Sequence, residues 1–203
     1  MKRFIASGAL SAAMMASQAI LIILSFPVAA STGPAAATWQ ALEAGGYVIV
    51  LAHAGEGVNA GSASSRASGN CSQDEHISDT GRQLLERIKT MLQRHGISAG
   101  RVLTSHDCRC VLTAGILFGR AEPWSIIDET GVADEQFAQQ RQAAVREAIS
   151  RWSSAGNLAL VTHQSTIKDA LGHELSAGEL LVVEPRGDTG FRIIGRLHPA
   201  QDF

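Results

Sequence analysis

The chain has 203 residues, 45% of them hydrophobic, with 20 Gly and only 5 Pro. This length suits one domain with a substantial core, and the mixed composition excludes collagen-like, low-complexity and wholly disordered chains. Without Lys2 and Arg3, which lie in the leader described next, 15 Lys and Arg remain against 19 Asp and Glu, so the chain lacks the basic footprint of a nucleic-acid-binding protein.

Residues 1–30 have the pattern of a signal peptide. The two basic residues precede a stretch without charged residues, Phe4 to Leu42, and small residues near Ala30 suit signal peptidase. The alternative is a retained membrane anchor, because Phe4 to Phe26 is long enough to span a bilayer. We therefore expect an exported, periplasmic protein or, alternatively, a membrane-anchored one that faces the periplasm.

The domain is expected to span residues 39–203, after a linker of small residues at 31–38. Residues 46–51 form a short, continuously apolar run that predicts a buried parallel strand. The Gly- and Ser-rich segment 55–70 lacks periodicity and is expected to be a loop. Apolar residues then recur at helical spacing between Ser78, a candidate N-cap, and Gly96, a candidate stop.

Strands and helices continue to alternate along the rest of the chain. We expect strands at 101–105 and 158–162, helices at 108–118, 134–153 and 165–171, and a closing hairpin of strands 180–183 and 191–197. This order predicts one α/β domain, a three-layer sandwich with a largely parallel central sheet flanked by helices. The sequence shows no internal repeat.

Three cysteines lie in this exported domain, where thiols tend to pair. A bridge between Cys108 and Cys110 would close a strained, tiny ring, which leaves Cys71 paired with either of them. The expected bridge is Cys71 to Cys108, with Cys110 as the free thiol. No Cys-x-x-Cys or His-x-x-x-His spacing supports a metal site.

Chemically active residues follow three of the predicted strands. His53, Arg109 and His163 come shortly after the strand runs that end at 51, 105 and 162. Ligands of α/β sheets bind beyond the carboxyl ends of the strands, so these side chains are expected to meet at one rim. Two imidazoles, a guanidinium and helix N-termini suit a phosphate dianion, and an imidazole can attack phosphorus.

At this point the sequence resembles the histidine phosphatase superfamily, which has the phosphoglycerate-mutase-like fold, and within it small exported members. The resemblance extends from about Trp39 to Pro199. It is carried by four segments in order: residues 45–54, similar to the opening strand and its Arg-His motif; 78–82, similar to a Ser-x-x-Gly helix start; 101–109, which end in the second arginine; and 160–164, which contain the second histidine.

The resemblance implies that His53 is the nucleophile and that Arg109 and His163 hold the phosphoryl oxygens. The implied reaction is hydrolysis of a small phosphomonoester through a phosphohistidine, without a metal or organic cofactor. A small phosphorylated molecule is thus the expected partner, nucleic acid is not, and a membrane is a partner only if the leader is retained. The oligomeric state is left open.

One position departs from the family pattern, because Ala52 stands where the motif has arginine. Losing this donor is expected to lower the rate by about 10²- to 10³-fold. Arg66, Arg82 and Lys168 are conceivable replacements, although a solvated surface is the commoner place for such residues. The alternative function is a non-catalytic phosphate- or phosphosugar-binding domain, a degenerate phosphatase.

The proton donor stays open between three carboxylates near the predicted rim, Glu56, Asp128 and Glu129. The sequence also leads us to expect stronger anion binding at pH 6, where the two histidines would carry more charge.

Overall fold

The computed structural model describes residues 33–54, 71, 77–129 and 134–198. All of them belong to one compact unit that spans Ser31–Phe203. The predicted signal peptide, the loop 55–70, Glu56 and Arg66 lie outside the described residues. Among the residues that are described, no helix is long and apolar enough to cross a membrane.

A six-stranded sheet forms the centre of the domain, in the order β3-β2-β4-β1-β5-β6. The strands are β1 (Val48–Ala52), β2 (Ala99–Thr104), β3 (Glu122–Pro123), β4 (Asn157–Thr162), β5 (Leu180–Pro185) and β6 (Phe191–Leu197). The pairs β1/β4, β2/β4 and β2/β3 are parallel, whereas β1/β5 and β5/β6 are antiparallel. The predicted largely parallel sheet and the closing hairpin are therefore confirmed.

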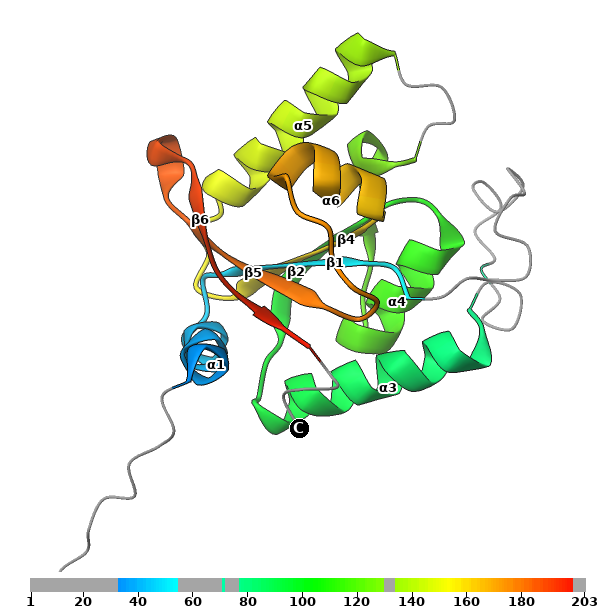
Figure 1. Ribbon diagram of the computed structural model, residues 1–203, viewed down its shortest axis with the longest axis vertical. Helices are drawn as coiled ribbons and strands as arrows, with labels where there is room; N and C mark the ends of the chain where they lie inside the picture. The colour runs from blue at the N-terminus through cyan, green and yellow to red at the C-terminus, as the bar shows by residue number, and fades with distance from the viewer. Residues whose placement is uncertain (1–32, 55–70, 72–76, 130–133, 199–203) are drawn as a thin grey trace, which may run out of the picture. The chain divides into compact units, whose positions relative to one another are not determined.

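Helices cover both faces of this sheet (Figure 1). On one face lie α1 (Pro34–Ala44), α3 (Asp79–Arg94) and α4 (Cys108–Phe118), and on the other α5 (Glu135–Ser150) and α6 (Gln164–Leu171). Strand β1 shows why two cores arise: Ile49 and Leu51 pack in one cluster, and Val48 and Val50 in the other. Alternate side chains of a strand point to opposite faces, so a continuously apolar strand supplies two cores.

The expectation of a linker at 31–38 is partly wrong, because helix α1 begins at Pro34 within this segment. Proline suits the first turn of a helix, since the N–H it lacks would have no partner there. The helix packs beside β6 at the position of Gly195, where a Cβ would come within 2.1 Å of Thr38 Oγ1. A glycine on the edge strand thus lets α1 approach the sheet closely.

The remaining elements agree with their predicted positions to within a few residues. Ser78 caps α3 through a hydrogen bond from the Gly81 N–H, and Asp134 caps α5 in the same way through Gln136. The sequence did not predict β3 or the short 3₁₀ helices η2 (Ser125–Ile127) and η3 (Gly187–Thr189). All three are too short to give a periodic pattern.

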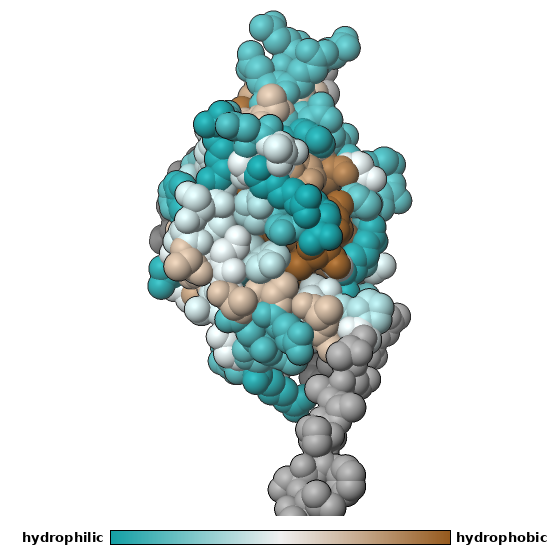
Figure 2. Space-filling model, turned by 90° about the vertical axis from the view of Figure 1, so that its left-hand side faces the viewer, coloured by the Kyte–Doolittle hydropathy of each residue, from teal (hydrophilic) through white to brown (hydrophobic). Residues whose placement is uncertain are grey.

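The sheet ends at β6 on one side of the domain, and Figure 2 shows this side of the molecule. Its surface is mostly hydrophilic, with a single hydrophobic area among the polar residues. Exposed arginines contribute to the polar character of the strand, since Arg192 and Arg196 are both solvent-exposed. Charged side chains on an edge strand oppose pairing with another chain.

A disulfide joins Cys71 to Cys108, the expected pair, with their Cα atoms 5.2 Å apart, and Cys110 is a buried free thiol. Cross-linking residues 37 positions apart should stabilise the folded chain by about 4 kcal/mol. We expect Cys71→Ser to lower the melting temperature by about 10 °C. Reduction should lower the melting temperature of the wild type equally and leave that of the variant unchanged. Three free thiols in protein purified without reductant would contradict this assignment.

Candidate active site

Two histidines meet where adjacent parallel strands end. The pairing of β1 with β4 places Ala52 opposite Thr162, and the His53 N–H donates a hydrogen bond to the Thr162 carbonyl at 2.9 Å. His53 and His163, the next residue of each strand, therefore lie side by side, with ring centroids 5.2 Å apart and ring planes at 73°. The strand register thus brings the two predicted imidazoles together.

Both imidazoles are neutral near pH 7 in the free protein. Burial, followed by the nearby Arg109 guanidinium, lowers the pKa of His53 to about 4. Burial likewise lowers the pKa of His163, although Glu129 partly offsets the effect. The expectation of more charge at pH 6 is therefore wrong for His53 in the free protein, because the behaviour of an exposed imidazole does not apply to this largely buried ring. A neutral imidazole is the form that can act as a nucleophile.

The lowered pKa of His53 makes folding sensitive to acid. Between pH 6.5 and about 4 the unfolded chain protonates this imidazole and the folded chain does not, so acidification favours unfolding. The contribution to the loss of stability should reach about 3 kcal/mol near pH 4. Denaturant unfolding across this range measures it, with His53→Gln as the matched control that lacks the titration. A His53 pKa near 6.5 by NMR would contradict this result.

Arg109 lies in the first turn of α4, directly beside the helix N-cap Asp107. Its guanidinium donates two hydrogen bonds to that carboxylate, Nε to Oδ1 at 3.0 Å and Nη2 to Oδ2 at 2.8 Å. Burial alone would raise the pKa of Asp107, but the side-chain and backbone hydrogen bonds of Arg109 lower it to about 2. The predicted phosphate-binding arginine is thus paired with a full negative charge.

The local charge is not that of a strong anion site. The largest charge effects on His163 come from three carboxylates, Glu129, Asp107 and Asp128, and from a single cation, Arg109. Ala52, at the end of β1, is partly buried and packs against the core under α5 and α6. The position that holds an arginine in the family motif therefore contributes only a methyl group.

The structure describes two of the conceivable replacement cations, Lys168 and Arg82. Lys168 is largely exposed and forms an ion pair with Glu174. Arg82 lines a groove between α3 and α4, together with Lys89 and Arg120. The third, Arg66, is outside the part of the chain that the structure describes.

Glu129 is the described carboxylate that reaches both the histidines and solvent. Its Oε2 lies 3.5 Å from Nδ1 of His163, its Oε1 accepts a hydrogen bond from Ser165, and half of its side chain is exposed. Asp128, the other described candidate for the proton donor, is bound to Ser105 and His106 instead. The geometry therefore favours Glu129 for proton transfer between the site and water.

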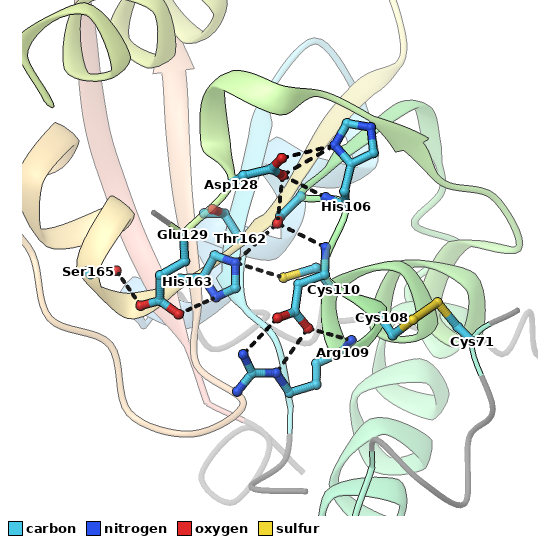
Figure 3. A network of polar contacts seen from close by, with 12 residues as sticks. Cys71, His106, Cys108, Arg109, Cys110, Asp128, Glu129, Thr162, His163 and Ser165 are labelled. Atoms are coloured by element: carbon cyan, nitrogen blue, oxygen red, sulfur yellow. Dashed lines mark hydrogen bonds and ion pairs between the residues drawn. A yellow bond between two sulfur atoms is a disulfide. The ribbon is translucent and has the colours of Figure 1, made fainter. Parts of the chain in front are cut away.

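A buried polar network lies on the other side of His163 (Figure 3). Ser105 Oγ is 3.1 Å from His163 Nε2 and 3.0 Å from Asp128 Oδ1, and the Cys110 sulfur is 3.8 Å from the same imidazole nitrogen. Burial raises the pKa of the Cys110 thiol, so this cysteine is protonated and unreactive. Sequence reasoning missed Ser105 and Asp107, although both lie in the turn between β2 and α4 that carries Arg109.

Within the described residues, no group of three His, Cys, Asp or Glu side chains is arranged to hold a metal ion. The polar atoms at the site instead include two imidazoles, one guanidinium and one accessible carboxylate. This set can bind an oxyanion, supply a nitrogen nucleophile and move a proton.

No family model matches the sequence, and no curated protein is found as a relative. Solved structures nevertheless share the fold. The protein histidine phosphatase SixA, complexed with tungstate, is 13% identical over 76% of this chain and 97% of its own, with a TM-score of 0.53. A phosphoserine phosphatase from Entamoeba histolytica is 12% identical over 77% of this chain and 98% of its own, with a TM-score of 0.55.

A mycobacterial glucosyl-3-phosphoglycerate phosphatase is also similar, at 14% identity over 72% of this chain and 96% of its own, with a TM-score of 0.52. These likenesses confirm the expected phosphoglycerate-mutase-like fold. They extend over nearly the whole length of the solved proteins, which are all phosphatases.

Proposed function

We propose that this protein is an exported phosphomonoester hydrolase of the histidine phosphatase type, slowed by Ala52. The observation that carries the proposal is the contact between two neutral imidazoles, the partly buried His53 and the buried His163, at the carboxyl ends of β1 and β4. A phosphatase fold with a neutral histidine at this rim has the nucleophile that phosphoryl transfer through a phosphohistidine needs.

The reaction takes two balanced steps. A lone pair of the His53 imidazole attacks phosphorus while the bond to the leaving alcohol breaks, and the alcohol oxygen takes a proton from Glu129. Water then attacks phosphorus, the P–Nε2 bond breaks with its electron pair returning to the His53 imidazole, Glu129 takes up a proton of that water, and inorganic phosphate leaves. Because Nδ1 of His53 is buried, the attacking nitrogen is Nε2. Arg109 and His163 hold the oxygens of the transferred group. Catalysis therefore comes mainly from positioning and from charge complementarity.

The substrate class is proposed from the predicted compartment. An exported enzyme of this kind would act on a small phosphomonoester, and a phosphorylated sugar of the cell envelope is the class we propose. The signal-peptide pattern of residues 1–30 supports a periplasmic domain, and a retained leader would anchor it to the membrane facing that compartment.

Two observations favour a second function, a phosphate- or phosphosugar-binding domain without turnover. Ala52 removes one cation from the motif. In addition, the Asp107 carboxylate accepts hydrogen bonds from Nε and Nη2 of Arg109, so these donors are already in use. A site with this balance of charge could retain a ligand without stabilising the extra charge that develops during transfer.

Asp107→Asn should strengthen anion binding. Asparagine caps helices as well as aspartate does, so the variant keeps the start of α4 and removes the charge that competes for Arg109. Freeing a charge-assisted pair of hydrogen bonds should tighten vanadate or phosphate binding by about tenfold. Titration calorimetry measures the affinity, and Asp107→Asn combined with Arg109→Ala is the control. Equal affinity in wild type and Asp107→Asn would place the anion away from Arg109.

A panel of phosphomonoesters, assayed with the purified exported protein, tests the proposed function. The panel should contain phosphosugars, phosphoserine and an activated aryl phosphate, because leaving groups of different basicity separate weak catalysis from none. We expect slow, vanadate-sensitive release of phosphate. Vanadate binding without turnover would support the second function, and neither binding nor turnover would contradict both.

A further inference from the structure

A chain of hydrogen bonds connects Asp128 to His163 through the Ser105 hydroxyl (Figure 3). Ser105 is 1% exposed and His163 is 2% exposed, so water does not compete for these contacts. The Asp107 N–H also points at Ser105 Oγ, at 3.2 Å. The hydroxyl therefore has three nitrogen or oxygen neighbours, and the Cys110 thiol also lies within its hydrogen-bonding range.

The chemistry of these neighbours sets the direction of each hydrogen bond. A hydroxyl has one hydrogen and two lone pairs, an ionised carboxylate only accepts, and a backbone N–H only donates. The Ser105 hydrogen must then go to Asp128, and one of its lone pairs receives the Asp107 N–H. The remaining lone pair faces His163 Nε2, and the 3.1 Å contact is attractive only if Nε2 carries a hydrogen.

Asp128 is itself held in the orientation that lets it accept the hydrogen of Ser105. The His106 N–H donates to its Oδ1 at 2.8 Å, and Nδ1 of the His106 ring lies 3.1 Å from its Oδ2. The oxygen that receives the Ser105 hydrogen is therefore fixed by the backbone of the same turn. Because this acceptor is fixed, the Ser105 hydroxyl has no equally good alternative acceptor for its hydrogen.

The opposite nitrogen of His163 has a different environment. Nδ1 is buried and has no hydrogen-bond partner among the described residues, and Glu129 Oε2 lies 3.5 Å away. If Nε2 holds its hydrogen permanently, protonation of the ring must occur at Nδ1. The resulting imidazolium would then lie between Glu129 and the Ser105–Asp128 pair.

We propose that Ser105 and Asp128 are positioning residues that fix His163 as its Nε2–H tautomer, so that Nδ1, facing Glu129, is where the ring gains and loses a proton. The use of this arrangement rests on the proposed function. In that function, a proton on His163 adds positive charge beside the transferred phosphoryl group, at a site where position 52 holds no arginine. The charged and titratable groups that face His163 are His53, Asp107, Arg109, Cys110, Asp128 and Glu129.

NMR of the complete, disulfide-bonded protein tests this directly, because long-range proton–nitrogen correlations distinguish protonated from unprotonated ring nitrogens. We expect Nε2 of His163 to be protonated and Nδ1 unprotonated at neutral pH. Asp128→Ala frees the Ser105 hydroxyl to donate to Nε2, so the ratio of tautomers should move toward Nδ1–H by about tenfold. Ser105→Ala removes the acceptor and should move it in the same direction.

Asp128→Asn is the matched control, because the His106 N–H keeps the amide oxygen at the position that accepts from Ser105. This variant should retain the Nε2–H tautomer while it removes the charge. A second readout is vanadate affinity, which Asp128→Ala should weaken by about threefold to tenfold. Asp128 is partly exposed, so its variants test the idea even if the buried Ser105→Ala does not fold.

The result that would overturn the proposal is a wild-type His163 protonated on Nδ1, or a tautomer ratio that is unchanged in Asp128→Ala. Activity is measured separately on the same samples. A protein that shows the expected tautomers but hydrolyses no phosphomonoester supports this arrangement and contradicts the proposed function. An active enzyme with unchanged tautomers in Asp128→Ala contradicts the arrangement alone.

Discussion

Ala52→Arg should raise phosphomonoesterase activity by at least tenfold and by as much as about 10²- to 10³-fold, the usual effect of one transition-state donor. Position 52 ends β1, directly before His53, the proposed nucleophile, and beside the end of β4. A guanidinium there would add a full positive charge that Asp107 does not already neutralise, and its planar fork can hold two phosphoryl oxygens at once. The measurement is kcat/KM on the best substrate of the panel.

Matched substitutions separate charge and geometry from side-chain length. Ala52→Met adds bulk without charge and should not raise the rate, and Ala52→Lys adds charge without the fork and should give a smaller gain than arginine. Melting temperatures of all three variants show whether the partly buried position accepts the longer chains. A fast wild-type enzyme that gains nothing from arginine would show that another cation already fills this role.

His53→Ala should abolish activity in the wild-type and Ala52→Arg backgrounds, by at least about 10³-fold in each. In the proposed mechanism this imidazole forms the covalent bond to phosphorus, so no increase in charge nearby can replace it. Single-turnover assays of both backgrounds measure the loss. His173→Ala, which removes a histidine that contacts Arg196 outside the site, should keep the activity of each background. Residual turnover above a tenth of the starting rate in His53→Ala would remove His53 from the nucleophile's role.

Most of the fold could be predicted because buried parallel strands leave a simple trace in the sequence. The runs 46–51 and 158–162 are continuously apolar, and the structure places them at the centre of the sheet as β1 and β4. The linker was the main error. Pro34 and the alanines after it look like a linker by composition, but they pack as a helix once Gly195 gives them room beside β6.

The site was predictable only in part, for a physical reason. His53 and His163 follow apolar strands, and parallel strands bring their carboxyl ends to one rim, so their meeting could be expected. The paired hydrogen bonds between Asp107 and Arg109 could not be predicted. A residue two positions before an arginine has no fixed side-chain direction until the start of the helix is known. Asp107 becomes the N-cap of α4, and that position aims its carboxylate at the guanidinium.

The same limit applies to the proton donor. Asp128 and Glu129 are neighbours in sequence, yet one is bound to Ser105 and His106 and the other faces His163 and solvent. Their different roles depend on the turn after η2, whose residues carry no periodic signal. Only the three-dimensional placement separates the positioning carboxylate from the accessible one.

The most direct test of the central claim is to trap the covalent intermediate. Protein mixed with a phosphomonoester labelled on phosphorus is quenched within the first turnover and digested, and the labelled peptide is sequenced by mass spectrometry. We expect an acid-labile, base-stable phosphohistidine at His53, at a higher level in Ala52→Arg than in wild type, and no label in His53→Ala. Turnover with label absent from His53, or with label on another residue, would contradict the account.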